Sequence, residues 1–226
     1  YTPTQGIPEL REKIAAHLRK KGVQFEEVMV TAGVTGGLLL ASLALINPGD
    51  EVVIPDPYFV MYEYQVLLMG GVPVFVDTYP DFRLREETFV KKLSKKTKFI
   101  IINSPNNPTG TIYSKEDLMS VIRIARERDL LILSDDIYDN FVFDEPTCPC
   151  IGQLYDKTLT FGGFSKGWAM TGWRLGYAAG PREILQQMIT LQQYTFSSVN
   201  SFAQKAAIKA LDFNVEDYIR GYKEKR

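Results

Sequence analysis

The chain has 226 residues, a formal net charge of -1, 45% hydrophobic residues and 12% aromatic residues. This composition is ordinary for a globular protein with one large core, and near-neutral, interspersed charge argues against nucleic acid or an anionic membrane as the main partner. No apolar run approaches the roughly 20 residues of a membrane helix, and the N-terminus lacks a signal-peptide pattern.

The cysteines and the histidine are few. Cys148 and Cys150 lie in a CPC stretch, and His17 is the one histidine of the sequence. These residues are too few for a zinc site, so no metal is expected. A disulfide between the two cysteines is not expected either, and a reducing cytoplasm fits best.

The first elements predicted are a helix, a strand and a second helix. Pro8 and the four-residue spacing of Leu10, Ile14 and Leu18 predict a helix within residues 1–21, with His17 exposed or at its rim. Residues 28–31 predict a strand, and residues 38–46 predict a helix that stops at an NPGD turn.

The glycine-rich stretch AGVTGG lies between that strand and the second helix. A strand, a glycine turn and a helix start present free backbone N–H groups and the positive end of the helix dipole, which suits phosphate. A plain tight turn has the same sequence, and both the Walker lysine and the GxGxxG spacing are absent. Alone, this stretch does not decide between a phosphate site and a turn.

Three further strands are predicted at residues 51–57, 72–77 and 99–102. The apolar run at 99–102 is typical of a parallel strand buried on both faces. A helix follows residues 58–62 and stops at the glycine pair 70–71, and a charged helix covers 86–93. Phe59 before the first of these helices is either an ordinary core aromatic or a ring that stacks on a flat ligand.

The loop SPNNPTG, residues 104–110, follows the strand at 99–102. Its prolines, asparagines and glycine predict a rigid loop that presents side-chain amides at the carboxyl end of the strand, where ligands bind in open α/β sheets. A turn without a ligand is the alternative. We expect the Asn107-Pro108 and Asp56-Pro57 bonds to be cis.

The next helix is predicted at residues 114–128, where Ser114 and Asp117 form a near capping box. A strand follows at 130–134, and Asp135, Asp136 and Tyr138 come directly after it. Two adjacent carboxylates can indicate a metal, but the further oxygen or histidine ligands are missing. We expect Asp135 to point into a site and Asp136 to point away from it.

The stretch TFGGFSKGWAMTGWRLGY, residues 160–177, contains Lys166 next to Ser165, with Arg174 eight positions further on. In this segment rich in glycine, aromatic residues and methionine, the Lys166 ammonium is predicted to be partly desolvated. Desolvation lowers a lysine pKa and makes its amine a nucleophile suited to Schiff bases. Arg174 indicates an anion such as phosphate, and together the two side chains indicate pyridoxal phosphate.

Strands are predicted at residues 158–161 and 175–179. The residues between them are too rich in glycine for a crossover helix, so the second of these strands is expected to be antiparallel. Residues 181–226 are predicted to be helical, with a break at 197–198.

The order and spacing of these motifs resemble the fold-type I pyridoxal-phosphate enzymes, specifically the class I and II aminotransferases. The resemblance implies a three-layer α/β/α fold with a mostly parallel seven-stranded sheet whose last strand is antiparallel. It also implies that residues 1–210 form the cofactor-binding large domain and that 211–226 begin the helix leading to a C-terminal small domain. The chain begins at Tyr1 without a methionine, and we expect it to be a fragment.

The resemblance assigns roles to single residues. Catalysis is implied for Lys166, which carries the cofactor as an aldimine, for Asp135 on the pyridine nitrogen and for Tyr138 on the ring oxygen. Phe59 would stack on the ring, and Asn107 would bind the ring oxygen and the substrate carboxylate. The remaining cofactor contacts are to the phosphate: Val34, Thr35, Ser165, Arg174 and, from the partner subunit of a homodimer, Tyr1.

One position departs from the family. Gly163 stands where many relatives have a hydroxyl residue, so the phosphate would depend more on the other donors. The predicted activity is transfer of an amino group between an L-amino acid and a 2-oxo acid, with the Lys166 amine moving the α-proton. A carbon–sulfur or cyclising lyase, the effector domain of a transcription regulator and an inactive fragment remain alternatives, and the NPTG tetrapeptide favours transamination.

Overall fold

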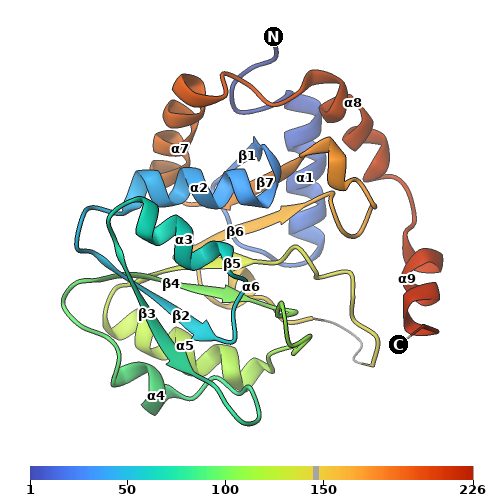
Figure 1. Ribbon diagram of the computed structural model, residues 1–226. Helices are drawn as coiled ribbons and strands as arrows, with labels where there is room; N and C mark the ends of the chain where they lie inside the picture. Colours follow the sequence, from blue (N-terminus) through green and yellow to red (C-terminus); the bar gives the residue numbers. More distant parts are fainter. Residues whose placement is uncertain (145–147, 226) are drawn as a thin grey trace.

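The computed structural model describes residues 1–144 and 148–225. Seven strands form one sheet in the order β1-β7-β6-β5-β4-β2-β3 (Figure 1). Neighbouring strands from β3 to β6 are parallel, whereas β7 is antiparallel to both β6 and β1. The bounds are β1 Glu27–Thr31, β2 Glu51–Asp56, β3 Val72–Asp77, β4 Thr97–Asn103, β5 Leu131–Asp135, β6 Thr158–Gly163 and β7 Gly176–Gly180. The predicted antiparallel last strand is confirmed.

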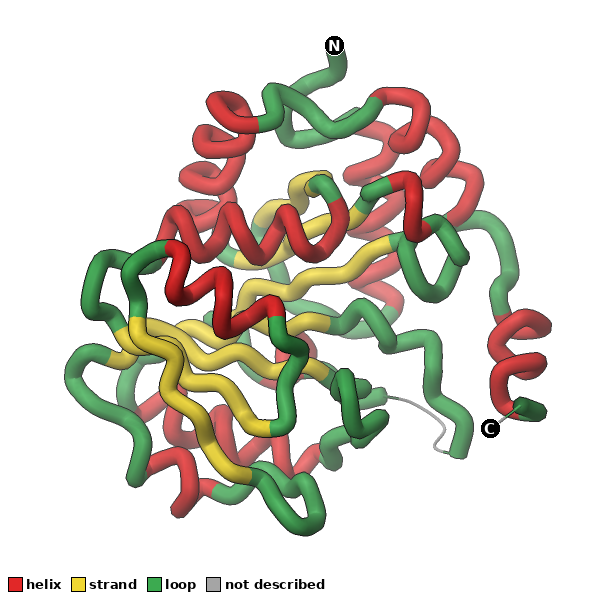
Figure 2. The backbone as a smooth tube through the Cα atoms, in the orientation of Figure 1, coloured by secondary structure: helices red, strands yellow, loops and turns green. Residues whose placement is uncertain are grey.

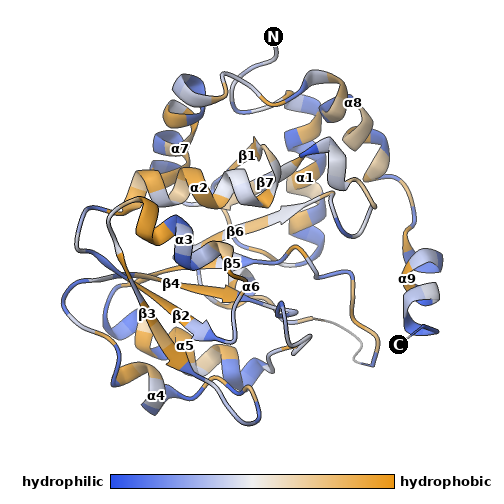
Figure 3. Cartoon of the chain, viewed as in Figure 1, coloured by the Kyte–Doolittle hydropathy of each residue, from blue (hydrophilic) through white to orange (hydrophobic). Residues whose placement is uncertain are grey.

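Helices cover both faces of the sheet, which confirms the predicted three-layer α/β/α fold. One layer holds α2 (Gly33–Leu45), α3 (Met61–Leu68) and α7 (Arg182–Thr195). The other face is covered by these helices, with α8 packed on α1: α1 Pro8–Lys20, α4 Glu86–Val90, α5 Lys115–Glu127, α6 Ile151–Leu154 and α8 Ser201–Ala210. Strands β2 and β4 are mostly orange in Figure 3, as expected of strands buried on both faces, whereas β6, with two threonines and two glycines, is paler.

The two-residue period of a strand distributes the core between these layers. In β4, Phe99 and Ile101 pack beneath α2 and α3, whereas Ile100 and Ile102 pack against α5. The same alternation sends Leu133 of β5 to the first face and Ile132 to the second. All of these side chains are buried.

Helix α2 begins earlier than the sequence predicted. The helix expected at 38–46 begins at Gly33, so the glycine stretch is its first turn and not a loop before it. Gly33 has a φ of +72°, which turns the chain from strand to helix. Gly37 lacks a Cβ that would come within 3.0 Å of the Phe161 ring. Packing on the sheet thus overrides the low helix propensity of glycine.

Other local predictions fared differently. The Ser114–Asp117 capping box is confirmed, and both predicted cis bonds are present, together with cis bonds before Pro80 and Pro105. The charged helix expected over 86–93 ends at Val90. The short helix α6 and a 3-10 turn, Thr171–Trp173, were not predicted.

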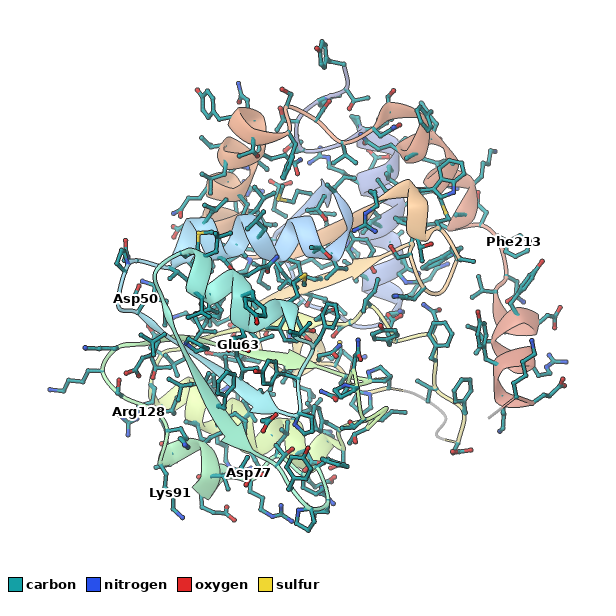
Figure 4. All side chains as sticks on the ribbon, viewed as in Figure 1. Asp50, Glu63, Asp77, Lys91, Arg128 and Phe213 are labelled. Atoms are coloured by element: carbon teal, nitrogen blue, oxygen red, sulfur yellow. The ribbon has the colours of Figure 1, made fainter. Side chains whose placement is uncertain are left out.

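The chain after α8 stands apart from the sheet (Figure 2). Phe213 lies exposed between α8 and α9 (Glu216–Lys223), and α9 has no buried residue (Figure 4). The predicted division at 210/211 coincides with the end of α8 but stays a prediction, and Arg226 lies outside the described residues. Within the described ranges, no helix has the length and apolar character needed to cross a membrane.

Candidate active site

One cavity of about 240 Å³ lies where the carboxyl ends of the central parallel strands meet the first turn of α2. Parallel strands end at the same edge of a sheet, and the loops that follow them converge there. All the predicted site residues except Tyr1 line this cavity: Val34, Thr35, Phe59, Asn107, Asp135, Tyr138, Ser165, Lys166 and Arg174. Tyr1 is fully exposed at the N-terminus, and its role toward a partner subunit stays a prediction.

Asp135 ends β5 and is 3% exposed. Its Oδ2 accepts a hydrogen bond of 2.7 Å from the Tyr62 hydroxyl, and its Oδ1 accepts one of 3.2 Å from the Ile137 N–H. Burial raises the pKa of the Asp135 carboxyl to about 6, although these hydrogen bonds and the charge of Lys166 act to lower it. The carboxylate is therefore held in one orientation and is mostly ionised at neutral pH.

Tyr62 was not predicted as a site residue. It lies on α3, is 3% exposed, and meets the Phe59 ring edge-on at a centroid distance of 5.8 Å. Burial and the neighbouring Asp135 raise the pKa of Tyr62 well above its usual value, so the phenol stays a donor. The sequence offered only a tyrosine near a helix start, which does not distinguish a site residue from a core residue.

Asn103 was also missed, although it immediately precedes the predicted loop. Its Nδ2 donates to the Asp135 backbone carbonyl at 2.8 Å, and its Oδ1 accepts from the Asn107 N–H at 2.8 Å. This buried amide therefore joins the end of β4 to the end of β5. The Asn107 side-chain amide in turn donates to the Tyr138 hydroxyl at 3.4 Å. Two of the predicted site residues are therefore hydrogen-bonded to each other.

Lys166 lies at the mouth of the cavity, with Nζ 5.6 Å from the centroid of the Tyr138 ring. The prediction that its ammonium is partly desolvated is wrong, because Lys166 is exposed. The apolar residues of its segment lie on the opposite side of the loop: Phe164 and Met170 are buried in the core with Tyr177. The apolar residues of this segment thus pack into the core on the side of the loop away from the Lys166 amine, and they do not surround the amine.

The predicted phosphate contacts meet at the start of α2. A Cβ at Gly33 would lie 3.0 Å from Arg174 Nη2, so the guanidinium sits directly beside the first turn. Arg174 Nη1 donates to the Thr171 carbonyl at 2.9 Å, and Ser165 and Thr35 border the same cavity. Free helix N–H groups and a guanidinium at one point suit an anion.

Gly163 is explained by packing. A Cβ at this position would lie 3.2 Å from Ile137 Cδ1, from Gly176 Cα and from the Leu175 carbonyl oxygen. A hydroxyl side chain at this position would therefore need these neighbours to move by a few tenths of an ångström.

Asp136 lies on the other face of the sheet, as predicted from its position next to Asp135. It lines a separate cavity, and its Oδ1 accepts a 2.6 Å hydrogen bond from Ser134 Oγ. Burial raises the pKa of the Asp136 carboxyl to about 7. Across residues 1–144 and 148–225, no group of three or more His, Cys, Asp or Glu side chains is placed to hold a metal ion.

Fold and cavity together define an α/β/α protein in which an accessible lysine, a buried carboxylate and a helix start with an adjacent arginine line one cavity. The family described as aminotransferase class I and II matches residues 1–226. The chain belongs to this family.

Individual relatives agree with this assignment. The chain is 42% identical, over 93% of its length, to a protein named aspartate aminotransferase from Pyrococcus abyssi, of which it covers 57%. It is 40% identical, over its full length, to aromatic-amino-acid aminotransferase 2 from Thermococcus litoralis, of which it covers 62%. The crystal structure of an aromatic aminotransferase from Pyrococcus horikoshii superposes with a TM-score of 0.94 at 39% identity, over 99% of this chain and 63% of that one. The chain thus spans about three fifths of the length of these relatives.

Proposed function

We propose that this chain is the cofactor-binding part of a pyridoxal-phosphate-dependent aminotransferase, which transfers an amino group between an L-amino acid and a 2-oxo acid. The observation that carries the proposal is the shared cavity of Lys166 and Asp135, an exposed amine and a buried, doubly hydrogen-bonded carboxylate. Family membership supports the same activity.

The residues present fit this cofactor. Asp135 would bind its ring nitrogen, because the carboxylate lines the cavity and is held in place by hydrogen bonds from the Tyr62 hydroxyl and the Ile137 N–H. Asn107 and Tyr138, already paired, would bind the ring oxygen, and Phe59 would cover a ring face. The phosphate would bind at the start of α2, where these donors converge: Val34, Thr35, Ser165 and Arg174.

Pyridoxal phosphate supplies an aldehyde that condenses with amines and a protonated ring that withdraws electrons from the substrate α-carbon. With this cofactor bound, Lys166 would supply the amine for its covalent attachment and the general base and acid that moves the substrate α-proton. Its exposure at the cavity mouth supports this role, since an amino acid must reach the same point. Asp135 would favour a protonated ring nitrogen, because its carboxylate is ionised above its pKa of about 6.

Transamination is favoured over lyase chemistry by the relatives. The relatives described above are named for aspartate or aromatic amino acids, and all are named aminotransferases. A carbon–sulfur or cyclising lyase would use the same cavity residues but would release ammonia or a cyclised product. A regulator domain would bind the cofactor without turnover. Product analysis therefore separates the three.

The proposal extends to the partners and the location of the protein. Amino acids and 2-oxo acids are the proposed substrates, which places the protein in amino acid metabolism. A homodimer with shared sites is supported by exposed aromatic side chains: Trp173 next to the cavity is 44% exposed and contacts Phe202, which is 68% exposed. A cytoplasmic location is supported by the free thiols of Cys148 and Cys150.

The test begins with cofactor attachment. Pyridoxal phosphate added to the chain is expected to produce a visible absorbance band that borohydride removes, with the added mass on Lys166. Lys166→Ala should show neither the band nor the mass and should have no amino-transfer activity. Lys92→Ala, at an exposed lysine of the opposite layer, is the control. A labelled residue other than Lys166, or full activity of Lys166→Ala, would contradict the proposal.

A further inference from the structure

The last turn of α1 lies behind the loop that carries Lys166. His17 and Lys21 are four residues apart, so their side chains leave the same side of the helix end. His17 contacts Trp168 of the loop, and Lys21 contacts Asp139, which follows Tyr138. Neither residue lines the cofactor cavity, and the proposed function gives them no role.

A chain of side-chain contacts connects Lys21 to Gly167, the residue after Lys166. Lys21 Nζ forms an ion pair with Asp139 Oδ2, and Asp139 Oδ1 accepts a 2.8 Å hydrogen bond from Asn140 Nδ2. The Asn140 amide fills the space beside Gly167, where a Cβ would lie only 2.7 Å from Nδ2. The ammonium of Lys21 is thus linked, through two side chains, to the backbone next to Lys166.

The same ion pair also holds the Tyr138 side of the cavity. Asp139 follows Tyr138 directly, and its backbone N–H donates to the Asp136 carbonyl at 3.1 Å. The turn is closed by the Phe141 N–H, which donates to the Tyr138 carbonyl at 2.8 Å. The ion pair between Lys21 and Asp139 therefore connects α1 both to the turn that follows Tyr138 and to the loop that carries Lys166.

His17 adds a second contact to the same loop. Its ring meets Trp168 edge-on at a centroid distance of 6.1 Å, and Trp168 packs on Phe164 at 5.2 Å. Burial, assisted by the charge of Lys21, lowers the pKa of His17 to about 4, so the imidazole is neutral against the indole. Within residues 1–144 and 148–225, His17 Nε2 and Trp168 Nε1 are both buried without a hydrogen-bond partner, so the two rings meet by van der Waals packing and not by a hydrogen bond.

We propose that Lys21 is a positioning residue for Lys166, acting through Asp139 and Asn140 on the loop that carries the amine and on Tyr138. The proposal rests on the proposed function, because it concerns the same amine. The side chains of Lys21 and Asp139 are 32% and 20% exposed, so water still reaches this partly buried pair and limits its contribution to global stability. The effect of breaking the pair is therefore expected in the loop and the cavity more than in the melting temperature.

The experiment compares Lys21→Met with Lys13→Met. Lys13 is also on α1 and also forms an ion pair, with Asp212, but away from the loop. Hydrogen exchange of the backbone amides of residues 138–141 and 164–170 is measured without cofactor, and pyridoxal phosphate affinity is then measured by absorbance titration. Lys21→Met should exchange faster in both segments and bind about two- to fivefold more weakly, the range expected for one partly exposed ion pair.

Two further variants keep the result specific. Lys21→Arg retains the charge and should restore both the exchange rates and the affinity. Asp139→Asn breaks the pair from the other side and should match Lys21→Met, which covers the case that one variant is poorly folded. Equal exchange in Lys21→Met and Lys13→Met would overturn the inference. Failure of the unaltered chain to bind pyridoxal phosphate would instead overturn the proposed function and leave the exchange result standing.

Discussion

Asp135 and Asp136 are neighbours in sequence, and both are buried, but they face opposite layers of the molecule. Asp135 accepts hydrogen bonds from the Tyr62 hydroxyl and the Ile137 N–H, and the positive charge of Lys166 lowers its pKa. Asp136 accepts one from Ser134, while Asp139 and Asp135 repel its charge. The pKa is raised to about 6 for the first carboxyl and to about 7 for the second, with burial as the largest cause in each case. The Asp135 carboxylate thus lines the proposed cofactor cavity, whereas the charge of Asp136, on the other face, is favoured only by the Ser134 hydrogen bond and the charge of Lys21 among the groups named for it.

The largest expected effect is on amino-group transfer. Asp135→Asn keeps the shape of the side chain but removes the charge proposed to hold the cofactor nitrogen protonated. The rate of 2-oxo acid formation should fall by about a hundredfold or more, as when a single electrostatic group is removed from an active site. Asp136→Asn, one residue away, should keep nearly full activity. Equal losses in the two variants would contradict the division between the faces.

The second effect concerns stability and pH. The folded-state pKa of Asp136 is about 7 against an unfolded value of 3.8, so the folded protein binds this proton more tightly. Its contribution to the free energy of unfolding therefore falls as pH rises from about 4 through about 7. Asp136→Asn mimics the protonated acid and should raise the free energy of unfolding at pH 8 by about 2 kcal/mol.

That gain should disappear near pH 4, where the native acid is also protonated. Denaturant unfolding at the two pH values measures the difference. A variant that is less stable than the native chain at pH 8 would show that the Asp136 charge has a favourable partner.

A third prediction removes a hydroxyl on the cofactor side. Tyr62→Phe deletes the 2.7 Å hydrogen bond to Asp135 Oδ2, which should cost about 1.5–3 kcal/mol because the acceptor is charged. This hydrogen bond lowers the pKa of Asp135. Its loss should therefore move the acid limb of the cofactor-binding profile to higher pH. An unchanged limb in an absorbance titration from pH 5 to 8 would count against the role given to Tyr62.

The smallest effect is expected for the matching change on the other face. Thr160 lines the Asp136 cavity, is 1% exposed, and its Oγ1 has no hydrogen-bond partner among the residues that the structure describes. Thr160→Val replaces the unpaired hydroxyl by a methyl group of similar size. We expect the free energy of unfolding to stay within about 1 kcal/mol of the native value or to rise, as measured by denaturant unfolding. A larger loss would show that the hydroxyl is paired in solution.

Much of the fold was predictable because its signals are local. The apolar runs of β2, β4 and β5 are long enough to identify buried strands, and the turn residues after them mark the loops that line the cavity. Adjacent positions of a strand point to opposite faces, so the separation of Asp135 from Asp136 followed from β5 alone. The start of α2 did not follow, because glycine signals a turn and only packing on Phe161 extends the helix to Gly33.

The site divides in the same way. By themselves, the residue types and their spacing determined the sheet and its antiparallel last strand. They also determined which loops carry Lys166, Asp135 and Asn107, because strands and loops are recognised from residues that are close together in the sequence. Tertiary structure alone decided that Tyr62 and Asn103 orient Asp135, that Lys166 is exposed, and that α1 reaches the back of its loop through Lys21. These are contacts between residues far apart in the chain, and burial or exposure is a property of the whole packed molecule that no short segment specifies.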